Sequence, residues 1–252
     1  NKLKWIPIIA TIFALIGWVY TETRGPIISL FLFSLLLLNS NVRKNIFLPR
    51  SFYITFVVII ISIFTLTNIG SRVTSGYAAT LNYVKNSDIK NFKWENPDSV
   101  TDRIILFHGS LNMIKKEPLT GVGLDKFNDE LHNQIINKDI PIIRENIDNP
   151  TMGYNHAHNQ YLDIFAKTGV LGFITLLYFI IINLSLLITG IKSDSKNINL
   201  FSLLGIITII TYSSHMLTQA IFSHQQSTIF MLIMLIIGLS SSRYYLNKDL
   251  KK

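Results

Sequence analysis

The sequence predicts an all-α, polytopic helical membrane protein with one large, mainly helical loop outside the cytoplasm. Two observations support this fold class. Of the 252 residues, 49% are hydrophobic and only 15% are charged, whereas about a quarter of the residues in soluble domains are charged. The hydrophobic residues also gather in long apolar runs, separated by short polar connections and one long polar segment. Lipid is therefore the expected solvent for much of the chain.

Composition also excludes several kinds of site. The chain contains no cysteine, which excludes disulfide frameworks, thiolate nucleophiles and thiolate metal sites. The net charge is +8, but the lysines and arginines are spread through the loops instead of gathering on one face. This distribution favours membrane lipid headgroups or phosphates as partners and argues against nucleic acid.

The beginning of the chain suggests a piece of a longer protein. Asn1 replaces the usual initiator Met, and an apolar run follows at once without a leader pattern. We expect further membrane spans upstream, and part of the functional site with them.

Six apolar runs predict six membrane spans. Most are shorter than the roughly 20 residues that cross a bilayer, but flanking Trp, Tyr and polar residues extend them. The second and fifth are the weakest, since such short runs also fit buried helices or re-entrant segments. The runs cover residues 5–20, 26–38, 52–67, 169–191, 200–212 and 228–239. The predicted organisation is three spans in 1–67, an extracytoplasmic loop in 68–168, three spans in 169–241 and a cytoplasmic tail in 242–252.

The short loops give the predicted orientation. Cytoplasmic loops are enriched in Lys and Arg. Basic residues follow the second, fourth and sixth spans: Arg43, Lys44 and Arg50; Lys192 and Lys196; Arg243, Lys248, Lys251 and Lys252. The connections 21–25 and 213–227 contain one Arg and none, and alternation places them on the opposite side. The segment 68–168 then also lies outside, because long loops translocate regardless of their charge.

The long loop itself predicts two helices. It opens with a polar, turn-rich stretch at 82–97. A helix over 100–116 follows, with apolar residues at 104, 107, 111 and 114, a cap at Asp98 or Ser99, and an end at Pro118, Gly121 and Gly123. Residues 119–123 superficially resemble a phosphate loop, but they lack its lysine and hydroxyl and follow no strand, so we interpret them as a turn. A second helix starts near His158 and runs into the fourth span.

Arg24 lies in the turn 21–26 between the first two spans. An ionisable side chain at the membrane boundary is costly unless it pairs or reaches the headgroups. Anion binding, contact with headgroups and pairing with Glu22 all explain its position.

Arg103 falls in the first turn of the predicted loop helix. The helix dipole disfavours a cation there by roughly a few tenths of a kcal/mol. Either Asp102 or Asp98 compensates for this, or an anion binds at the helix N-terminus beside the guanidinium.

Polar residues gather at 154–162, immediately before the fourth span. Histidine is the natural proton acceptor for a hydroxyl nucleophile, which makes His158 a candidate base. A zinc site at His156 and His158, with His132, is the weaker alternative, because a two-residue spacing assures no third ligand. Helix capping by Asn155 and interfacial hydrogen bonding are the structural alternative. Four more polar residues border the outer ends of the last two spans, either lining an aqueous cavity or simply hydrated: His215, Gln219, His224 and Gln225.

Three motifs then occur in a characteristic order. They are Thr23-Arg24-Gly25; Arg103 followed by Met113-Ile114, Pro118-Leu119 and Gly121-Val122-Gly123; and His158-Asn159 followed, after nine residues, by Gly169-Val170-Leu171-Gly172. In order and spacing they resemble the O-antigen ligase and polymerase superfamily of bacterial membrane glycosyltransferases. The resemblance covers essentially the whole chain, as the carboxy-terminal part of a family member. Phe173 and Ile174 stand where ligases often have Thr, which leaves the choice between ligase and polymerase open.

The resemblance implies an inverting glycosyl transfer from a polyprenyl diphosphate-linked glycan donor, without metal, cofactor or nucleotide sugar. Arg24 and Arg103 would hold the departing diphosphate, and His158 would take the proton of the acceptor hydroxyl. The apolar spans would bury the polyprenyl chain, and the outer loop would recognise sugars and act as a lid. Further substrate contacts are expected at His156, Asn159, Tyr154 and Tyr161. Tyr154, Tyr161 and Trp94 would stack on sugars or anchor the membrane interface.

The main hypothesis is an O-antigen ligase that joins the glycan to the lipid A core at the periplasmic or exterior face of the bacterial cytoplasmic (inner) membrane. The alternatives within the same chemistry are an O-antigen or capsular repeat-unit polymerase and a protein O-oligosaccharyltransferase. A non-enzymatic transporter would need polar residues in the middle of several spans, whereas these spans are almost uniformly apolar. A purely structural membrane protein would explain the position of neither arginine.

Overall fold

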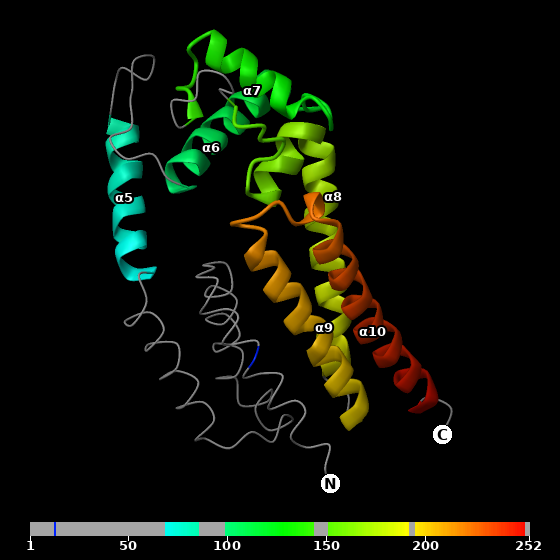
Figure 1. Ribbon diagram of the computed structural model, residues 1–252. Coiled ribbons are helices and arrows are strands. Elements are labelled where there is room, and N and C mark those ends of the chain that lie inside the picture. The colour runs from blue at the N-terminus through cyan, green and yellow to red at the C-terminus, as the bar shows by residue number, and fades with distance from the viewer. Residues whose placement is uncertain (1–12, 14–68, 86–98, 144–150, 192–194, 250–252) are drawn as a thin grey trace.

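The computed structural model describes residues 13, 69–85, 99–143, 151–191 and 195–249. Within these residues the fold is all-helical and contains no strand, which confirms the predicted fold class (Figure 1). The helices are α5 (Ile69–Lys85), α6 (Ser99–Lys116), α7 (Phe127–Ile136), α8 (Gln160–Ile191), α9 (Lys196–His215), the short 3-10 helix η4 (Ile221–Ser223) and α10 (Gln225–Asp249).

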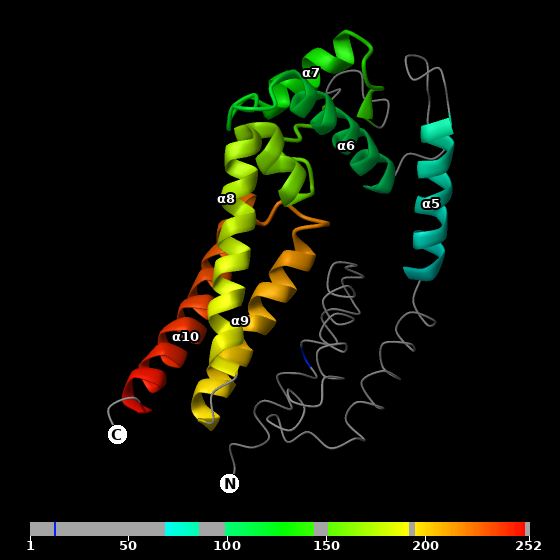
Figure 2. The same cartoon turned by 180° about the vertical axis from the view of Figure 1, so that it is seen from behind.

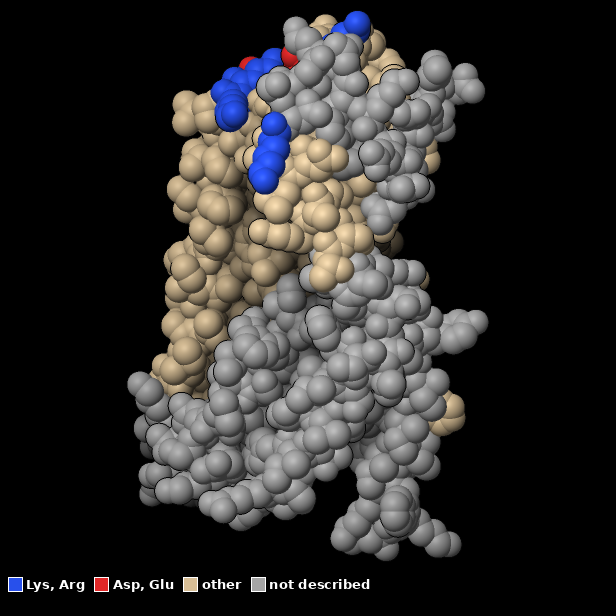
Figure 3. Space-filling model, turned by 90° about the vertical axis from the view of Figure 1, so that its left-hand side faces the viewer, with Lys and Arg blue, Asp and Glu red and all other residues tan. Residues whose placement is uncertain are grey.

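Three of these helices are long and apolar enough to cross a membrane: α8, α9 and α10. They correspond to the predicted fourth, fifth and sixth spans. Only 11% of the most apolar window of α8 and 17% of that of α10 are buried, so most of their apolar side chains face outward, as lipid contact requires. Figure 3 shows the described Lys, Arg, Asp and Glu of one face at one end of the molecule, above an uncharged surface. The first three predicted spans lie outside the described residues.

Small residues let the membrane helices approach closely. A Cβ on Gly238 of α10 would lie 2.9 Å from the Cα of Gly205 of α9, so the two backbones touch. The hydroxyls of Ser202 and Ser242 form a buried hydrogen bond of 2.7 Å between the same two helices. Glycine and serine at such contacts are typical of membrane helix packing.

Helix α8 is broken at Gly169, which has φ 67° and ψ −164° (Figure 2). As predicted, a helix begins near His158 and continues into the fourth span, but its course is not continuous. The Val170 N–H donates to the carbonyl of Pro118 (2.9 Å), and the carbonyl of Ala166 accepts from the N–H of Val122 (2.8 Å). Backbone bonds with a distant turn therefore replace those of a continuous helix. At about 1.5 Å per residue, residues 170–191 then cover roughly 33 Å, close to the hydrocarbon thickness of a bilayer.

A cap, which we define as α6, α7 and residues 151–168, lies across one end of the membrane helices (Figures 1 and 2). Its core is apolar and includes Ile105, Leu106, Met113, Phe127, Leu131 and Ala166. The predicted helix over 100–116 is confirmed by α6, whose regular helix ends at Lys116, before Pro118. Its predicted apolar row at 104, 107, 111 and 114 is only partly buried or exposed, because the neighbouring face packs into the core.

Two helical segments differ from the sequence-based expectation. Helix α7 was not predicted, because it is short and largely polar; its packing is fixed by Phe127, Leu131 and Ile135 at helical spacing. Residues 82–85 were predicted to open a turn-rich stretch, but they form the last turn of α5. The rest of that stretch, up to residue 97, lies outside the described residues.

Candidate active site

The candidate base His158 lies in a strained loop immediately before α8. Its φ of 50° is in the left-handed region, which costs a residue with a side chain about 1–2 kcal/mol. Two neighbouring contacts hold the loop: the Ala157 N–H donates to the Asp163 carboxylate (3.0 Å), and the His158 N–H donates to His156 Nδ1 (3.3 Å). Strain of this kind persists only where surrounding contacts fix it, as they do here.

A hydrogen bond from a distant turn orients the His158 ring. Its Nδ1 lies 2.8 Å from the amide oxygen of Gln219, in the turn between α9 and α10. An amide oxygen only accepts, so this pairing places the imidazole proton on Nδ1. The other nitrogen, Nε2, then carries the lone pair and is the atom that accepts a proton from a substrate hydroxyl.

The surroundings of His158 lower its pKa below the usual value. Burial is the largest cause, because it disfavours the charged imidazolium. The Gln219 hydrogen bond and the charge of Asp102 oppose this shift, whereas the charges of Arg103 and His224 add to it. His158 is therefore neutral, and able to act as a base, at neutral pH.

His156 is a different kind of side chain, although it is only two residues away. Burial, reinforced by the charges of His158, Lys167 and His224, lowers its pKa to about 4. Its ring lies 4.3 Å from that of His158, centroid to centroid, and its Nδ1 accepts the His158 N–H. The proton then resides on Nε2, so His156 offers a hydrogen-bond donor rather than a second base at neutral pH.

Arg103 lies near this pair from the first turn of α6. It is half-buried and lines a cavity of about 580 Å³ between α5, α6 and the turn residues Leu217 and Thr218. Its neighbour Asp102, 1% exposed, accepts a hydrogen bond from the Tyr154 hydroxyl (3.0 Å). The Tyr154 ring in turn lies edge-on to His158, with centroids 5.3 Å apart. Four predicted site residues are thus brought together: Arg103, Tyr154, His156 and His158.

Two other predicted substrate contacts, Asn159 and Tyr161, have backbone partners. The Asn159 side-chain oxygen accepts from the N–H groups of Tyr161 (3.0 Å) and Leu162 (3.1 Å), and its nitrogen donates to the Leu217 carbonyl (3.0 Å). Asn159, and not Asn155 as considered from the sequence, therefore caps α8. The Tyr161 hydroxyl donates to the Ser213 carbonyl (2.9 Å). Their contact with substrate remains a prediction.

A buried ion pair, Asp163 and Lys167, supports the histidine loop and was not recognised from the sequence. The two side chains bond at 3.0 Å, and Asp163 is 3% exposed. The Lys167 ammonium also lies 5.3 Å from the centroid of the Phe127 ring, a cation–π contact. The only sequence signal for the pair is its i,i+4 spacing before an apolar span.

The two glycine motifs form one contact. Gly121 has φ 68°, and a Cβ there would overlap the backbone carbonyl of Lys167; Gly169 has φ 67°, and a Cβ there would overlap the Leu119 carbonyl. The Gly123 N–H donates to the Lys167 carbonyl (3.0 Å). The role of these glycines is therefore to lock the turn after α6 against the break in α8, which holds the cap on the membrane helices.

Tyr83 and His108 form a second polar contact that was not predicted, on the wall of the Arg103 cavity. The Tyr83 hydroxyl lies 2.8 Å from His108 Nδ1 and links α5 to α6. Burial raises the pKa of Tyr83 to about 12 and lowers the pKa of His108 below its usual value. Both groups are therefore uncharged at neutral pH and leave the guanidinium as the charged group in the cavity lining.

The remaining predictions concern a zinc site and two further residues, Arg24 and Trp94. Among the described residues, no three His, Cys, Asp or Glu side chains converge as metal ligands would. His132, the third ligand considered from the sequence, is exposed on α7. Arg24 and Trp94 lie outside the described residues.

Comparison with known proteins decides the family. The sequence profile described as O-antigen ligase matches residues 9–177, more than half of the chain. The chain belongs to the O-antigen ligase family. The match confirms the resemblance seen in the motifs, and its range includes Arg24, Arg103, His158 and the break in α8 at Gly169. Membership, together with the membrane helices, indicates a bacterial membrane protein.

This O-antigen ligase family member also resembles a curated protein of Haemophilus influenzae that is described as an uncharacterized protein. The two are 27% identical over 146 residues. The aligned region is 57% of this chain and 35% of the relative, so the chain spans about a third of the relative's length.

Proposed function

We propose that this protein is an O-antigen ligase, which transfers a glycan from polyprenyl diphosphate to the lipid A core at the periplasmic face of the inner membrane. The observation that carries the proposal is the environment of the His158 ring. Its Nδ1 is bound by Gln219, its Nε2 is an acceptor, and burial, together with the charge of Arg103, lowers its pKa. A neutral base beside a guanidinium is the pair of groups that transfer from a diphosphate to a hydroxyl requires.

The proposed step begins with the acceptor. His158 Nε2 takes the proton of the acceptor hydroxyl as its oxygen attacks the anomeric carbon of the donor sugar. The new C–O bond forms on the face opposite the diphosphate, so the configuration inverts. The bond to the diphosphate oxygen breaks, and its electron pair leaves with the diphosphate.

The arginines act on that departing charge. Arg103, and Arg24 from the segment between the first two spans, hold the diphosphate through charge-assisted hydrogen bonds that strengthen as the bond breaks. Because the arginines supply the positive charge, the step as proposed uses neither a metal nor a nucleotide sugar. Base catalysis of this kind contributes about 100- to 10,000-fold.

The surrounding side chains fit a polar sugar above the base. His156 offers an N–H on Nε2, because its Nδ1 already accepts the His158 N–H. The Tyr154 ring packs edge-on against His158, so it keeps the imidazole in place and presents an aromatic surface. We therefore propose these two residues as substrate contacts, ahead of Asn159 and Tyr161, whose polar groups bind backbone.

The experiment uses the full-length protein in a host that lacks its own ligase. Polysaccharide on the lipopolysaccharide is compared for wild type and for His158→Ala, Arg24→Ala and Arg103→Ala at matched expression. His132→Ala, an exposed histidine on α7, is the control. We expect capped core with wild type and the control, and only a small residual amount with the three variants. If wild type leaves the core uncapped but lengthens carrier-linked chains, the protein is a polymerase. If the three variants behave as wild type, the assigned site is wrong.

A further inference from the structure

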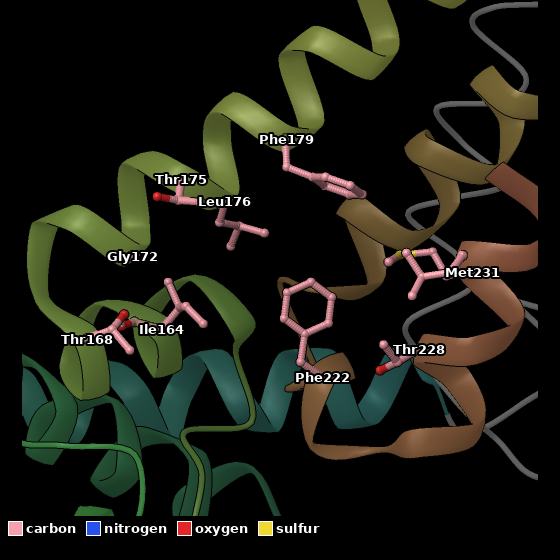
Figure 4. A pocket seen from close by; sticks show the side chains of 10 residues that line it. Ile164, Thr168, Gly172, Thr175, Leu176, Phe179, Phe222, Thr228 and Met231 are labelled. Atoms are coloured by element: carbon pink, nitrogen blue, oxygen red, sulfur yellow. Dashed lines mark hydrogen bonds between the residues drawn. The ribbon is translucent and has the colours of Figure 1, made fainter. Parts of the chain in front are cut away.

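A second cavity, which we call the α8–α10 groove, opens between two membrane helices (Figure 4). Its volume is about 470 Å³, within the range of small-molecule sites. The groove is lined by Ile164, Thr168, Gly172, Thr175, Leu176 and Phe179 of α8, Phe222 of η4, and Thr228, Met231 and Leu232 of α10. None of these ten residues is ionisable. The groove is therefore suited to an uncharged ligand.

The three threonines of the groove do not make it polar. The Thr168 hydroxyl donates to the Ile164 carbonyl (2.6 Å), Thr175 to Leu171 (2.8 Å) and Thr228 to Ile221 (3.0 Å). Each hydroxyl is thus satisfied by nearby backbone, which leaves the methyl groups as apolar surface. A ligand that needs hydrogen bonds would lose its bonds to water here without replacing them.

The position of the groove between membrane helices favours a hydrocarbon chain as its ligand. Both long walls belong to helices that can cross the membrane, and the adjoining Leu171 is 70% exposed. Phe222 is 39% exposed and projects between α8 and α10 (Figure 4). A groove with such walls, within the bilayer, is filled by the tail of a lipid rather than by water.

One turn connects this groove to the candidate active site. In the turn between α9 and α10, Leu217 and Thr218 line the Arg103 cavity, Gln219 binds His158, and Phe222 lines the α8–α10 groove. Gln160 fixes the turn through two hydrogen bonds. Its side-chain oxygen accepts from the Phe222 N–H (2.7 Å), and its backbone N–H donates to the Met216 carbonyl (2.8 Å). The position of a chain in the groove is thus set relative to the base.

The two cavities differ in the charge of their lining residues. This difference indicates which of the two lipid substrates each cavity fits. The Arg103 cavity suits a lipid with a diphosphate next to its tail, which is the proposed donor. The α8–α10 groove has no cation in its lining and suits a bare chain. We propose that the groove binds one acyl chain of the lipid that bears the acceptor hydroxyl, a reading that rests on the proposed function. The groove then positions the acceptor while the donor occupies the Arg103 side.

The first test identifies the chain directly. Full-length protein is placed in vesicles of phosphatidylethanolamine and phosphatidylglycerol that contain a phospholipid with a photoreactive diazirine on one acyl chain. A parallel sample contains a diazirine-bearing polyprenyl phosphate. We expect the acyl probe to label Phe222 and Met231 several-fold more than Ile229, an exposed residue of α10 outside the groove lining. Equal labelling of all three positions, or preferential labelling of the groove by the polyprenyl probe, overturns the proposal.

The second test asks whether the chain belongs to the acceptor. Leu232→Trp fills the groove, and Ile233→Trp, at a neighbouring exposed position outside the lining, is the matched control. We expect Leu232→Trp to reduce labelling and to raise the KM for the lipid acceptor about tenfold with little change in kcat, because it weakens acceptor binding alone. Equal KM values in the two variants overturn the proposal. Labelling does not depend on transfer, so a wild type that transfers nothing refutes the proposed function separately.

Discussion

The cap and the membrane helices are held together by different kinds of contact. In the cap, buried polar and charged side chains bond to one another or to backbone, as Asp163 does with Lys167 and as Gln134 does with the Gly109 carbonyl (3.1 Å). In the membrane helices, glycine contacts and a hydrogen bond between Ser202 and Ser242 serve the same purpose. The stability of the cap therefore depends on each buried polar group having its partner, whereas that of the membrane helices depends on small side chains at their contacts.

The largest expected effect is from removal of one partner in the cap. Lys167→Met leaves Asp163, which is 3% exposed, without its cation, and should lower the free energy of unfolding by about 3–5 kcal/mol. Chemical unfolding in mixed micelles measures the change. The control is Lys167→Met combined with Asp163→Asn, which removes the stranded charge but keeps an acceptor for the Ala157 N–H. If the double variant is no more stable than Lys167→Met, an unpaired charge is not the cause.

The glycine contact between the turn and α8 should give the next largest effect. Gly121→Ala combines a left-handed φ with an overlap against the Lys167 backbone, for an expected loss of about 2–4 kcal/mol. Gly153→Ala is a matched control, since its φ is also 68° but nothing lies within 4 Å of the new Cβ. In the same unfolding measurement, the control should lose only the cost of a left-handed φ at a residue with a side chain, about 1 kcal/mol. Equal losses would show that the backbone overlap contributes nothing.

The pH dependence of transfer should move in opposite directions for two cap variants. In the proposed step His158 must be neutral, so the rate of transfer should fall as pH drops through the pKa of this residue. Arg103→Met removes a charge that lowers this pKa, so the acid limb should move to higher pH. Gln219→Leu removes a hydrogen bond that raises it, so the limb should move to lower pH. Rates of transfer measured across pH test both signs. Because Arg103→Met should retain only residual transfer, each profile is normalised to its own maximum rate before the acid limbs are compared. Shifts in the same direction would exclude His158 as the titrating group.

Gln219→Leu should also slow transfer at its optimal pH. The ring loses the bond that fixes its tautomer, and about 1.4 kcal/mol of lost orientation corresponds to about a tenfold lower kcat. The KM for either substrate should change little, because Gln219 acts through His158. A changed KM with an unchanged kcat would instead place Gln219 in contact with substrate.

The smallest effect is expected in the membrane helices. Ser202→Ala removes one interhelical hydrogen bond and should cost about 0.6 kcal/mol in the unfolding measurement. The pH profile of transfer should remain that of wild type. A shift in that profile would show that the contact between α9 and α10 reaches the active site, contrary to the division between the cap and the membrane helices.

The sequence was sufficient to predict those helices whose pattern of apolar residues lies within one short segment. Apolar runs predicted the last three spans, and helical spacing predicted α6. The break in α8 depends instead on bonds between Val170 and Pro118 and between Val122 and Ala166, pairs that are far apart in the chain. A glycine at 169 permits such a break, but the sequence analysis did not predict one, because the bonds that stabilise it come from a distant turn.

The candidate site shows the same limit. The chemistry of the imidazole singled out His158, but its partner Gln219 is 61 residues away and was expected either to line an aqueous cavity or to be hydrated. The sequence offered Asn155 as the helix cap, whereas Asn159 caps α8. The difference is where α8 begins, within a few residues, and helix boundaries are not defined so closely by sequence.

The break at Gly169 has a consequence for how this protein tolerates insertions. In an unbroken helix, one inserted residue turns everything beyond it by about 100°. Here the segment that follows His158 is bound to the turn after α6 on the cap side of the break, through the carbonyls of Ala166 and Lys167. A residue inserted after Leu176 would therefore rotate the remainder of α8 against its neighbours without changing the phase of His158. The length of the membrane-spanning part of α8 and the orientation of His158 can thus vary independently.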